Sequence, residues 1–430
     1  MNKGNKEILD IALPSIVSNI TVPLLGLIDV AIVGHLGSAS YIGAIAIGSM
    51  IFNIIYWLFG FLRMGTSGMT SQAFGANDSQ ETARLLVRSC GVGFIVSVIL
   101  ILMQYPIEKI SFALIHTTPE IYELTSRYFR ICIWGAPAVL GLYSLSGWFI
   151  GMQNSRYPMY VAITQNIVNI LASLLFVYGW GMKIEGVAFG TLIAQYAGFI
   201  MACLLWNHQY GTLVLHLHLK ALTNRQAMSQ FFQINRDIFF RTLCLIAVTT
   251  YFTSAGAKQG DIILAVNTLL MQLFTIFSYF MDGFAYAGEA LTGKYIGAEQ
   301  HDALRKMFGR LFRWGFGIAI AFTLIYTLSG EHFLQLLTNE QSVIQASKEY
   351  FIWAILIPIT GYSAFLMDGI FIGATRTRYM LWGMMTASFF FFIIYFMLKE
   401  TGNHALWASF VVYLSIRGIV QRILGRKILQ

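Results

Sequence analysis

Long runs of apolar residues, nearly free of charge, recur along the whole chain. Each run stays apolar on all sides for about twenty residues, which as an α-helix is enough to cross a hydrocarbon core of ~30 Å. Transmembrane strands differ, because they alternate apolar and polar residues over about ten positions. The clearest runs predict membrane-spanning helices at residues 41–62, 131–155, 157–182, 186–206, 262–281 and 379–398.

More broken apolar segments fill the stretches between these runs. They lie near residues 9–34, 85–105, 231–256, 314–329, 348–372 and 404–424. The two sets together predict twelve transmembrane helices with short connections, so the expected fold class is an all-α polytopic membrane protein. Composition agrees, since 57% of the 430 residues are hydrophobic and only 11% are charged, whereas about a quarter are charged in typical soluble domains.

Lysine and arginine are distributed unequally between alternate connections. With the N-terminus placed in the cytoplasm, most of them fall on the cytoplasmic side, while Lys109, Lys183, Lys258 and Lys399 fall outside. This positive-inside bias predicts that both termini are cytoplasmic. It also accounts for the net charge of +8 without a nucleic-acid partner. The expected partners are therefore the lipid bilayer and small molecules.

The two halves of the chain match each other at a constant shift of 222 residues. The shift pairs Arg88 with Arg310 and Gly151 with Gly373, and a single ungapped offset predicts an internal duplication. Six helices per half is an even number, so both halves enter the membrane the same way and their pseudo-twofold axis runs along the membrane normal. The expected domains are a six-helix lobe at 1–210, a cytoplasmic inter-lobe loop at 211–228 and a second six-helix lobe at 229–430.

The first apolar segment contains an aspartate, a residue that is rare within membrane-spanning helices. Asp29 has no basic neighbour in its helix, and a carboxylate within a membrane is costly and therefore a candidate functional group. Counting ~1.5 Å per residue along each helix places Asn169, Ser173 and Thr191 at a similar depth. An oxygen-rich cluster around one carboxylate would bind a proton or a sodium ion. Ordinary interhelical hydrogen bonding is the alternative for these polar residues.

Acidic and basic residues are mixed in the C-terminal lobe. Arg241, Asp282, Glu289 and Asp368 all fall towards the cytoplasmic end of their predicted helices by the same counting. We expect them to pair with one another, together with Arg417, in a buried ionic network that orients helices or closes a gate. A second ion site at Asp282 or Asp368 is the alternative.

Motifs for nucleotide, metal or hydrolytic chemistry are absent from the sequence. It contains no GxxxxGK[ST], no HExxH and no GxSxG, which excludes energisation by ATP on this chain. We expect no enzymatic activity, no catalytic residues, no resident metal and no organic cofactor. A coupling ion is the one small partner that the cluster around Asp29 suggests.

Four segments resemble one family of membrane proteins. IDVAIVGHLG at 28–37, INRDIFFRTL at 234–243, MDGFAYAGEALTGKYIGA at 281–298 and MDGIFIGATRTRYM at 367–380 are similar to the DinF branch of the MATE (multidrug and toxic compound extrusion) transporters. The likeness runs through nearly all twelve predicted helices. It implies a secondary antiporter that exports organic, cationic or amphipathic compounds in exchange for H+ or Na+ by alternating access.

The resemblance also assigns roles to residues around Asp29. The family's coupling residue on the first helix matches Asp29, and its asparagine and threonine match Asn169 and Thr191. Many relatives carry an aspartate where this chain has Ser173. With one carboxylate fewer, a bound Na+ at Asp29, Asn169 and Thr191 would lose a charged ligand, so the resemblance favours proton coupling here.

Two further functions stay open on the sequence. A flippase of the same superfamily, for lipid-linked oligosaccharides or precursors, would need several basic residues to hold pyrophosphate, and the first lobe offers Arg63, Arg127 and Arg130. A channel or an intramembrane enzyme is the alternative of a different class, although neither requires two duplicated lobes. The expected location is the cytoplasmic (inner) membrane, and the expected state is a monomer.

Overall fold

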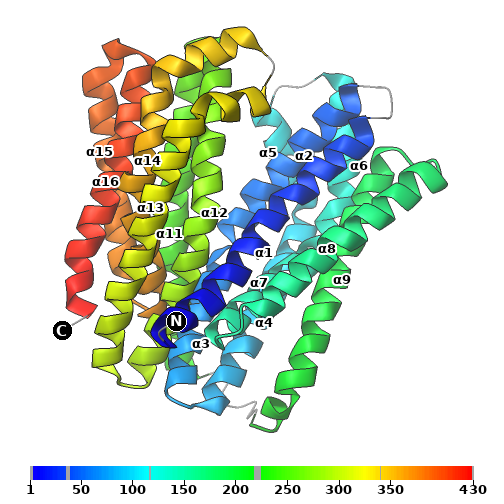
Figure 1. Ribbon diagram of the computed structural model, residues 1–430. Coiled ribbons are helices and arrows are strands. Elements are labelled where there is room, and N and C mark those ends of the chain that lie inside the picture. Colours follow the sequence, from blue (N-terminus) through cyan, green and yellow to red (C-terminus); the bar gives the residue numbers. More distant parts are fainter. Residues whose placement is uncertain (1–2, 35–38, 116–117, 217–223, 339, 429–430) are drawn as a thin grey trace. The chain divides into compact units, whose positions relative to one another are not determined.

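The computed structural model describes residues 3–34, 39–115, 118–216, 224–338 and 340–428. Within these ranges all regular structure is helical and there is no strand (Figure 1). Twelve helical stretches in the described residues are long and apolar enough to cross a membrane, judged by length and composition. The predicted fold class, an all-α polytopic membrane protein, is confirmed. The middle of the predicted inter-lobe loop, residues 217–223, lies outside the described residues.

The helices follow one another with short connections. In the first half of the chain the α-helices are α1 (Lys3–Gly34), α2 (Ala39–Leu58), α3 (Phe61–Gly75), α4 (Ser79–Leu102), α5 (Gln104–Leu114), α6 (Pro119–Cys132), α7 (Ala136–Gly151), α8 (Arg156–Leu174) and α9 (Ile184–Tyr210). In the second half they are α11 (Arg225–Ala257), α12 (Asp261–Gly297), α13 (His301–Leu337), α14 (Gln341–Gly373), α15 (Thr377–Leu398) and α16 (Asn403–Gly425). Short helices are η1 (Ile133–Gly135), η2 (Leu175–Gly179), η3 (Gly211–His216), η4 (Lys399–Thr401) and η5 (Arg426–Ile428).

The helix predicted at residues 131–155 overlaps a candidate span that combines two α-helices. The candidate span Pro119–Gly151 contains α6, the short helix η1 and α7. Pro137 lies in the first turn of α7, where its missing N–H costs nothing because that group has no partner within the helix. Between α6 and α7 the chain continues as the short 3-10 helix η1. Pro358, in contrast, lies inside α14 without ending it.

The chain divides into two compact units. The N-terminal unit is Val17–Ser229, and the C-terminal unit combines Met1–Ile16 with Gln230–Gln430. This division differs from the lobes expected at 1–210 and 229–430, because the first part of α1 packs with the C-terminal unit.

Polar contacts explain why the start of α1 belongs to the C-terminal unit. The Tyr295 hydroxyl of α12 donates a hydrogen bond of 2.6 Å to Glu7 Oε2, and Lys294 Nζ lies 3.9 Å from Glu7 Oε1. The sequence pattern treats α1 as one apolar run and gives no sign of this division. Helix α1 thus carries Glu7 in one unit and Asp29 in the other.

The predicted internal repeat is present in the backbone. The structure gives positive φ angles to four described residues other than glycine, namely Asn77 (57°), Gln153 (63°), Glu299 (56°) and Thr375 (51°). A left-handed conformation is uncommon outside glycine. Asn77 and Glu299 are 222 positions apart, and so are Gln153 and Thr375. The same helix-ending turn therefore occurs at matched positions in both halves.

Close helix crossings repeat with the same offset. In the N-terminal unit α3 packs on α7, and a Cβ at Gly147 would lie 2.2 Å from the Arg63 carbonyl oxygen. In the C-terminal unit α12 packs on α14, and a Cβ at Gly369 would lie 2.1 Å from the Ala285 carbonyl oxygen. Only glycine allows two backbones to approach this closely, a common device between membrane helices. These crossings form the buried centre of each unit.

Candidate cation-coupling site

Asp29 lies at the centre of a polar group within the N-terminal unit. Its side chain is buried, with 4% of the residue exposed, and Thr191 Oγ1 of α9 donates a hydrogen bond of 3.1 Å to Asp29 Oδ2. Asn169 Nδ2 of α8 donates to Thr191 Oγ1, also at 3.1 Å, so the threonine hydroxyl links the asparagine to the aspartate. Three of the residues that the sequence singled out are thus in contact.

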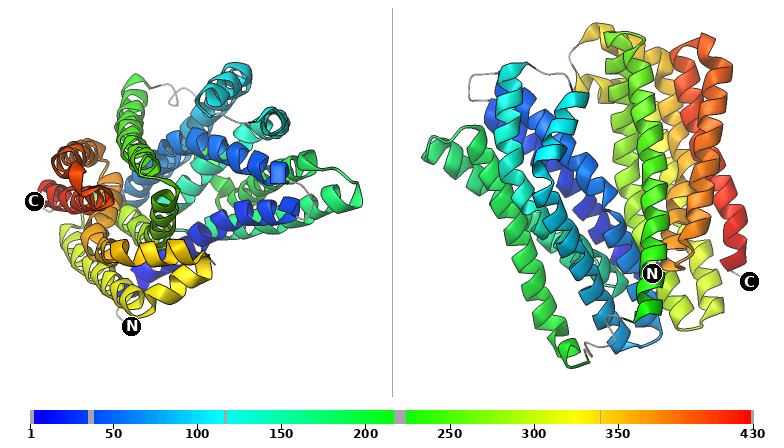
Figure 2. Two further views of the ribbon diagram at one scale, coloured as in Figure 1. Left: turned by 90° about the horizontal axis from the view of Figure 1, so that it is seen from above. Right: turned by 180° about the vertical axis from the view of Figure 1, so that it is seen from behind.

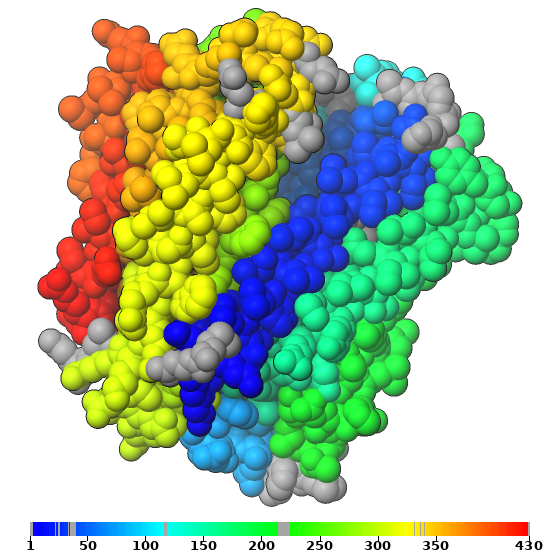
Figure 3. Space-filling view, in the orientation of Figure 1, coloured from blue at the N-terminus to red at the C-terminus, as the bar shows by residue number. Residues whose placement is uncertain are grey.

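The close pairing of α8 and α9 positions this group. The two helices run side by side in every view (Figures 1 and 2). A Cβ at Gly190 would lie 2.1 Å from Ser173 Oγ, so the glycine lets Ser173 pack directly on the α9 backbone. Thr191, the next residue, is then aimed at Asp29. On the exposed face of the unit, residues 17–34 of α1 and the adjacent α8 form neighbouring bands (Figure 3).

Ser173 differs from the other three predicted residues. It is fully buried at the level of the group, but its hydroxyl forms no hydrogen bond with any described residue. The depth predicted from the sequence is not enough to bring it to Asp29, because it faces the glycine of α9 instead. Ser173 is near the site without being one of its bonded members.

The polar group around Asp29 contains hydrogen-bond acceptor atoms that have no donor among the described residues. Asp29 Oδ1 and Asn169 Oδ1 are buried and have no hydrogen-bond partner among the described residues. No described basic residue offsets the charge of Asp29, whose polar neighbours are the neutral Thr191 and Asn169. A buried carboxylate without a counter-charge is costly. The arrangement suits a group that takes up a proton or a small cation and becomes neutral.

A short π-helix joins the end of α8 to α1. Helix η2 (Leu175–Gly179) continues α8, and Trp180 N donates to Leu175 O at 3.1 Å, one residue further back than in an α-helix. Within it, the Tyr178 hydroxyl donates to the Ile32 carbonyl of α1 at 3.2 Å. Single-turn π-helices are rare and often lie at functional sites. Sequence reasoning missed this contact, because the apolar pattern of residues 157–182 is that of a continuous α-helix.

Asp368 of the C-terminal unit is surrounded by basic and amide groups. Arg241 Nη2 of α11 and Arg417 Nη2 of α16 both donate to Asp368 Oδ2, and Gln421 Nε2 donates to Oδ1 at 2.7 Å. Asp368 is 6% exposed and both arginines are buried. Two guanidinium groups on one carboxylate form the ionic network predicted from the sequence. Both oxygens of Asp368 therefore accept hydrogen bonds from described side chains.

The other acids predicted on this side take different places. Asp282 of α12 is partly buried and close enough to Arg417 to interact with it electrostatically, so it adds a second negative charge to the network. Glu289 is buried two turns further along the same helix. Gln421 is a member that the sequence analysis missed, because an uncharged amide near the end of the last helix gives no signal of its own.

Arginines of the N-terminal unit that could have held a pyrophosphate are largely engaged with acids. Arg127 pairs with Glu123 at 2.5 Å and with Glu185 at 3.1 Å. Arg130 pairs with the buried Glu108 at 3.2 Å. These contacts satisfy the positive charges locally, so the geometry does not favour the flippase alternative.

The sequence matches the family described as MatE over residues 14–175 and again over residues 238–399. The two matches start 224 residues apart, two residues from the shift of the internal repeat. Among similar curated proteins, "DNA damage-inducible protein F" of Escherichia coli (strain K12) is 35% identical over 419 residues, covering 97% of this chain and 91% of that protein. "Multidrug export protein MepA" of Staphylococcus aureus (strain NCTC 8325 / PS 47) is 19% identical over 340 residues, covering 79% and 75%.

Solved structures share the fold. One described as "Crystal structure of MATE in the bent conformation" superposes with a TM-score of 0.90 and covers 100% of this chain and 96% of its own. Its sequence identity to this chain is 18%, so the similarity concerns the fold. The fold of this chain is therefore the one found in that structure.

Proposed function

Because this chain belongs to the MatE family of membrane transporters, we propose that it is a secondary active antiporter that exports organic compounds, cationic or amphipathic, in exchange for protons. The resemblance inferred from the sequence is thereby confirmed at the level of the family. The name of the Staphylococcus aureus relative, a multidrug export protein, supports export of organic compounds. The proposed location is the cytoplasmic membrane, with both termini in the cytoplasm and a monomer as the working unit.

The buried carboxylate of Asp29 is the observation that carries the proposal. When Asp29 is charged, Thr191 stabilises it by donating to Oδ2. When Oδ1 takes up a proton, the charge disappears and the new O–H needs an acceptor. Asn169 Oδ1, which lacks a donor among the described residues, is available for that role. We therefore expect the site to satisfy both protonation states of Asp29.

Protonation then changes how the N-terminal unit interacts with a cationic substrate. A charged Asp29 attracts a cation in the low-dielectric interior, and a neutral Asp29 does not. Proton and organic cation thus compete for the same negative charge, which is the basis of exchange. Sodium is the less favoured coupling ion, because Asp29 is the one carboxylate of the group and Ser173 supplies no second charge.

Purified protein in liposomes tests this function. We expect a pH gradient that is acidic inside the liposomes to drive uptake of cationic dyes, because protons leave as the dye enters. A sodium gradient alone should drive no uptake. Asp29→Asn keeps the size of the side chain and removes the titratable group, so dye movement should no longer be coupled to protons. Asp237→Asn, which changes another buried aspartate, is the matched control and should retain coupling. Unchanged proton-to-dye stoichiometry in Asp29→Asn would contradict the proposal.

A further inference from the structure

Two cations flank a pair of aromatic rings at one end of the C-terminal unit. The Arg378 guanidinium lies 5.2 Å from the centre of the Trp382 ring, and Lys427 Nζ lies 5.8 Å from the centre of the Tyr379 ring. The two rings are themselves 5.8 Å apart at a steep angle. Helix α15 supplies three of these residues and η5 supplies the lysine. Figure 2 shows α15 and α16, which lead to this end, running side by side.

The charge at this end is not balanced by acids. Helices α15, α16 and η5 contain no aspartate or glutamate, and Arg422 and Arg426 add two more positive charges beside Lys427. The nearby Asp237 accepts a hydrogen bond from Thr377 at 3.3 Å but is paired with Arg236, also at 3.3 Å. Among the described residues, no ion pair involves Arg378 or Lys427. An anion is therefore the partner that this surface fits.

An apolar stripe continues directly from the charged end of α15. Arg378, Trp382, Met385 and Phe389 follow one another at helical spacing, so they lie on one face. Trp382 is 44% exposed, Met385 is 53% exposed and Phe389 is 63% exposed. Cation, tryptophan and apolar side chains in that order match the headgroup, interface and acyl region of a lipid leaflet. The stripe selects a phospholipid as the anion, because a soluble phosphate would not need it.

The internal repeat provides a comparison within the molecule. At the shift of 222, Arg378 corresponds to Arg156 of the N-terminal unit, whereas the last two turns of α9, Cys203–Tyr210, contain no lysine or arginine. The short helix η3 that follows α9 contains no lysine or arginine either. The duplicated fold therefore does not require these cations, and the second half alone combines them with the ring pair.

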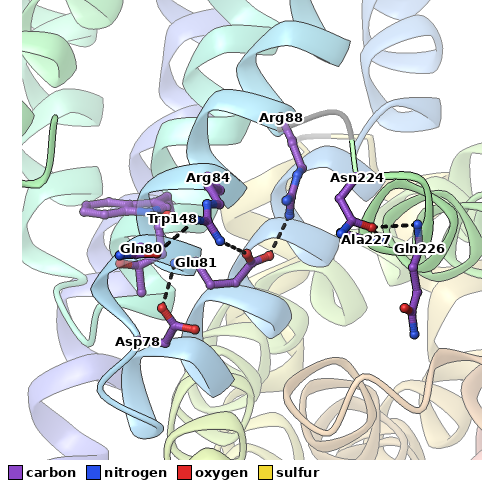
Figure 4. A network of polar contacts seen from close by, with 10 residues as sticks. Asp78, Gln80, Glu81, Arg84, Arg88, Trp148, Asn224, Gln226 and Ala227 are labelled. Atoms are coloured by element: carbon purple, nitrogen blue, oxygen red, sulfur yellow. Dashed lines mark hydrogen bonds and ion pairs between the residues drawn. The ribbon is translucent and has the colours of Figure 1, made fainter. Parts of the chain in front are cut away.

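Charges at the matching end of the N-terminal unit are neutralised locally. Arg88 is buried and pairs with Glu81 of its own helix at 2.6 Å, and Arg84 lies 3.8 Å from the same carboxylate. Figure 4 shows both arginines directed at Glu81, with Asp78 capping the start of α4. Basic residues at a membrane end can thus be held by acids in this fold. Because α15, α16 and η5 contain no acidic residues, the cations Arg378 and Lys427 remain available to a ligand.

We propose that Arg378, Tyr379, Trp382 and Lys427 form a binding site for the phosphate headgroup of an anionic phospholipid, whose acyl chains lie along the stripe on α15. The two cations hold the phosphate by charge-assisted hydrogen bonds, and the rings fix the orientation of the cations. Basic pockets beside membrane helices bind anionic headgroups in this way. The site is independent of the coupling site around Asp29.

Native mass spectrometry of the purified full-length protein tests the proposal. Phosphatidylglycerol and phosphatidylethanolamine with identical acyl chains are added separately, so that only the headgroup charge differs. We expect the wild type to retain phosphatidylglycerol preferentially. The double variant Arg378→Gln/Lys427→Gln should bind it about twenty-fivefold more weakly, because each basic group near an anionic lipid contributes about fivefold. Arg156→Gln/Arg225→Gln removes the same charge from the N-terminal unit and should bind like the wild type.

Two further measurements keep the result interpretable. Thermal unfolding of each variant in detergent shows whether it is folded, and Trp382→Ala, which keeps both cations, should give a smaller loss than the double variant. Equal binding of the two lipids by the wild type would overturn the proposal, and so would equal losses in the two double variants. Displacement of phosphatidylglycerol by inorganic phosphate alone would also overturn it, because the acyl stripe would then contribute nothing.

Discussion

Two buried aspartates, one in each unit, have opposite surroundings. Asp29 and Asp368 are similarly buried, at 4% and 6% exposed. Asp29 is surrounded by a hydroxyl and an amide, whereas Asp368 receives two guanidinium groups and an amide. The same side chain thus lacks a basic partner among the described residues in one unit and is paired with two in the other. Under the proposed function, neighbours more than depth in the membrane decide which acid exchanges protons.

Removing Asp368 is expected to give the largest loss of stability. In Asp368→Leu, Arg241 and Arg417 remain buried without their shared carboxylate, and breaking a buried ion pair from one side costs about 3–5 kcal/mol. In Asp29→Asn no buried charge is left unpaired, so the free energy of unfolding should change by no more than about 1 kcal/mol. Unfolding of both variants by denaturant in the same detergent measures the contrast.

The triple variant Arg241→Met/Asp368→Leu/Arg417→Met separates charge from packing. Replacing a whole buried ionic group by apolar side chains is often neutral, so much of the stability lost in Asp368→Leu should return. Similar losses in Asp29→Asn and Asp368→Leu would remove the distinction between the two acids.

The sequence was sufficient to group Asp29, Asn169 and Thr191. Membrane helices have a fixed rise per residue and span a layer of known thickness, so counting along the chain places polar residues at a common depth. Depth alone cannot give the direction of a side chain. Ser173 therefore has the expected height, but it packs on Gly190 rather than on Asp29.

Other features could not be predicted because they depend on packing between distant segments. The start of α1 belongs with the C-terminal unit through Glu7 and Tyr295, which are far apart in the sequence. The π-helix after α8 changes the hydrogen-bond spacing without changing the apolar pattern. The offset of the internal repeat, in contrast, could be predicted from the sequence. The matched turns at Asn77 and Glu299 are separated by the same 222 residues.

Removing the hydroxyl that stabilises Asp29 is expected to give an intermediate effect. Thr191→Val keeps the shape of the side chain and deletes the donor to Oδ2, which costs the charged form of Asp29 about 1 kcal/mol, or roughly fivefold in an equilibrium constant. Proton-coupled dye transport at a fixed pH gradient should therefore fall by a similar factor. Thr191→Ser keeps the donor and should transport like the wild type. If Thr191→Val and Thr191→Ser give the same rate of proton-coupled dye transport, the hydrogen bond to Asp29 has no role in transport.

The smallest effect is expected at Ser173. Its hydroxyl is buried without a hydrogen-bond partner among the described residues, and deleting a polar group that makes no bond costs little or is favourable. Ser173→Ala should therefore leave both the unfolding free energy and the proton-to-dye stoichiometry close to those of the wild type. Gly190→Ala, in contrast, would push α9 away from Ser173 and disturb the position of Thr191. A loss of coupling in Ser173→Ala would mean that the hydroxyl turns towards Asp29 at another stage of the transport cycle, and the group around that aspartate would then have four members instead of three.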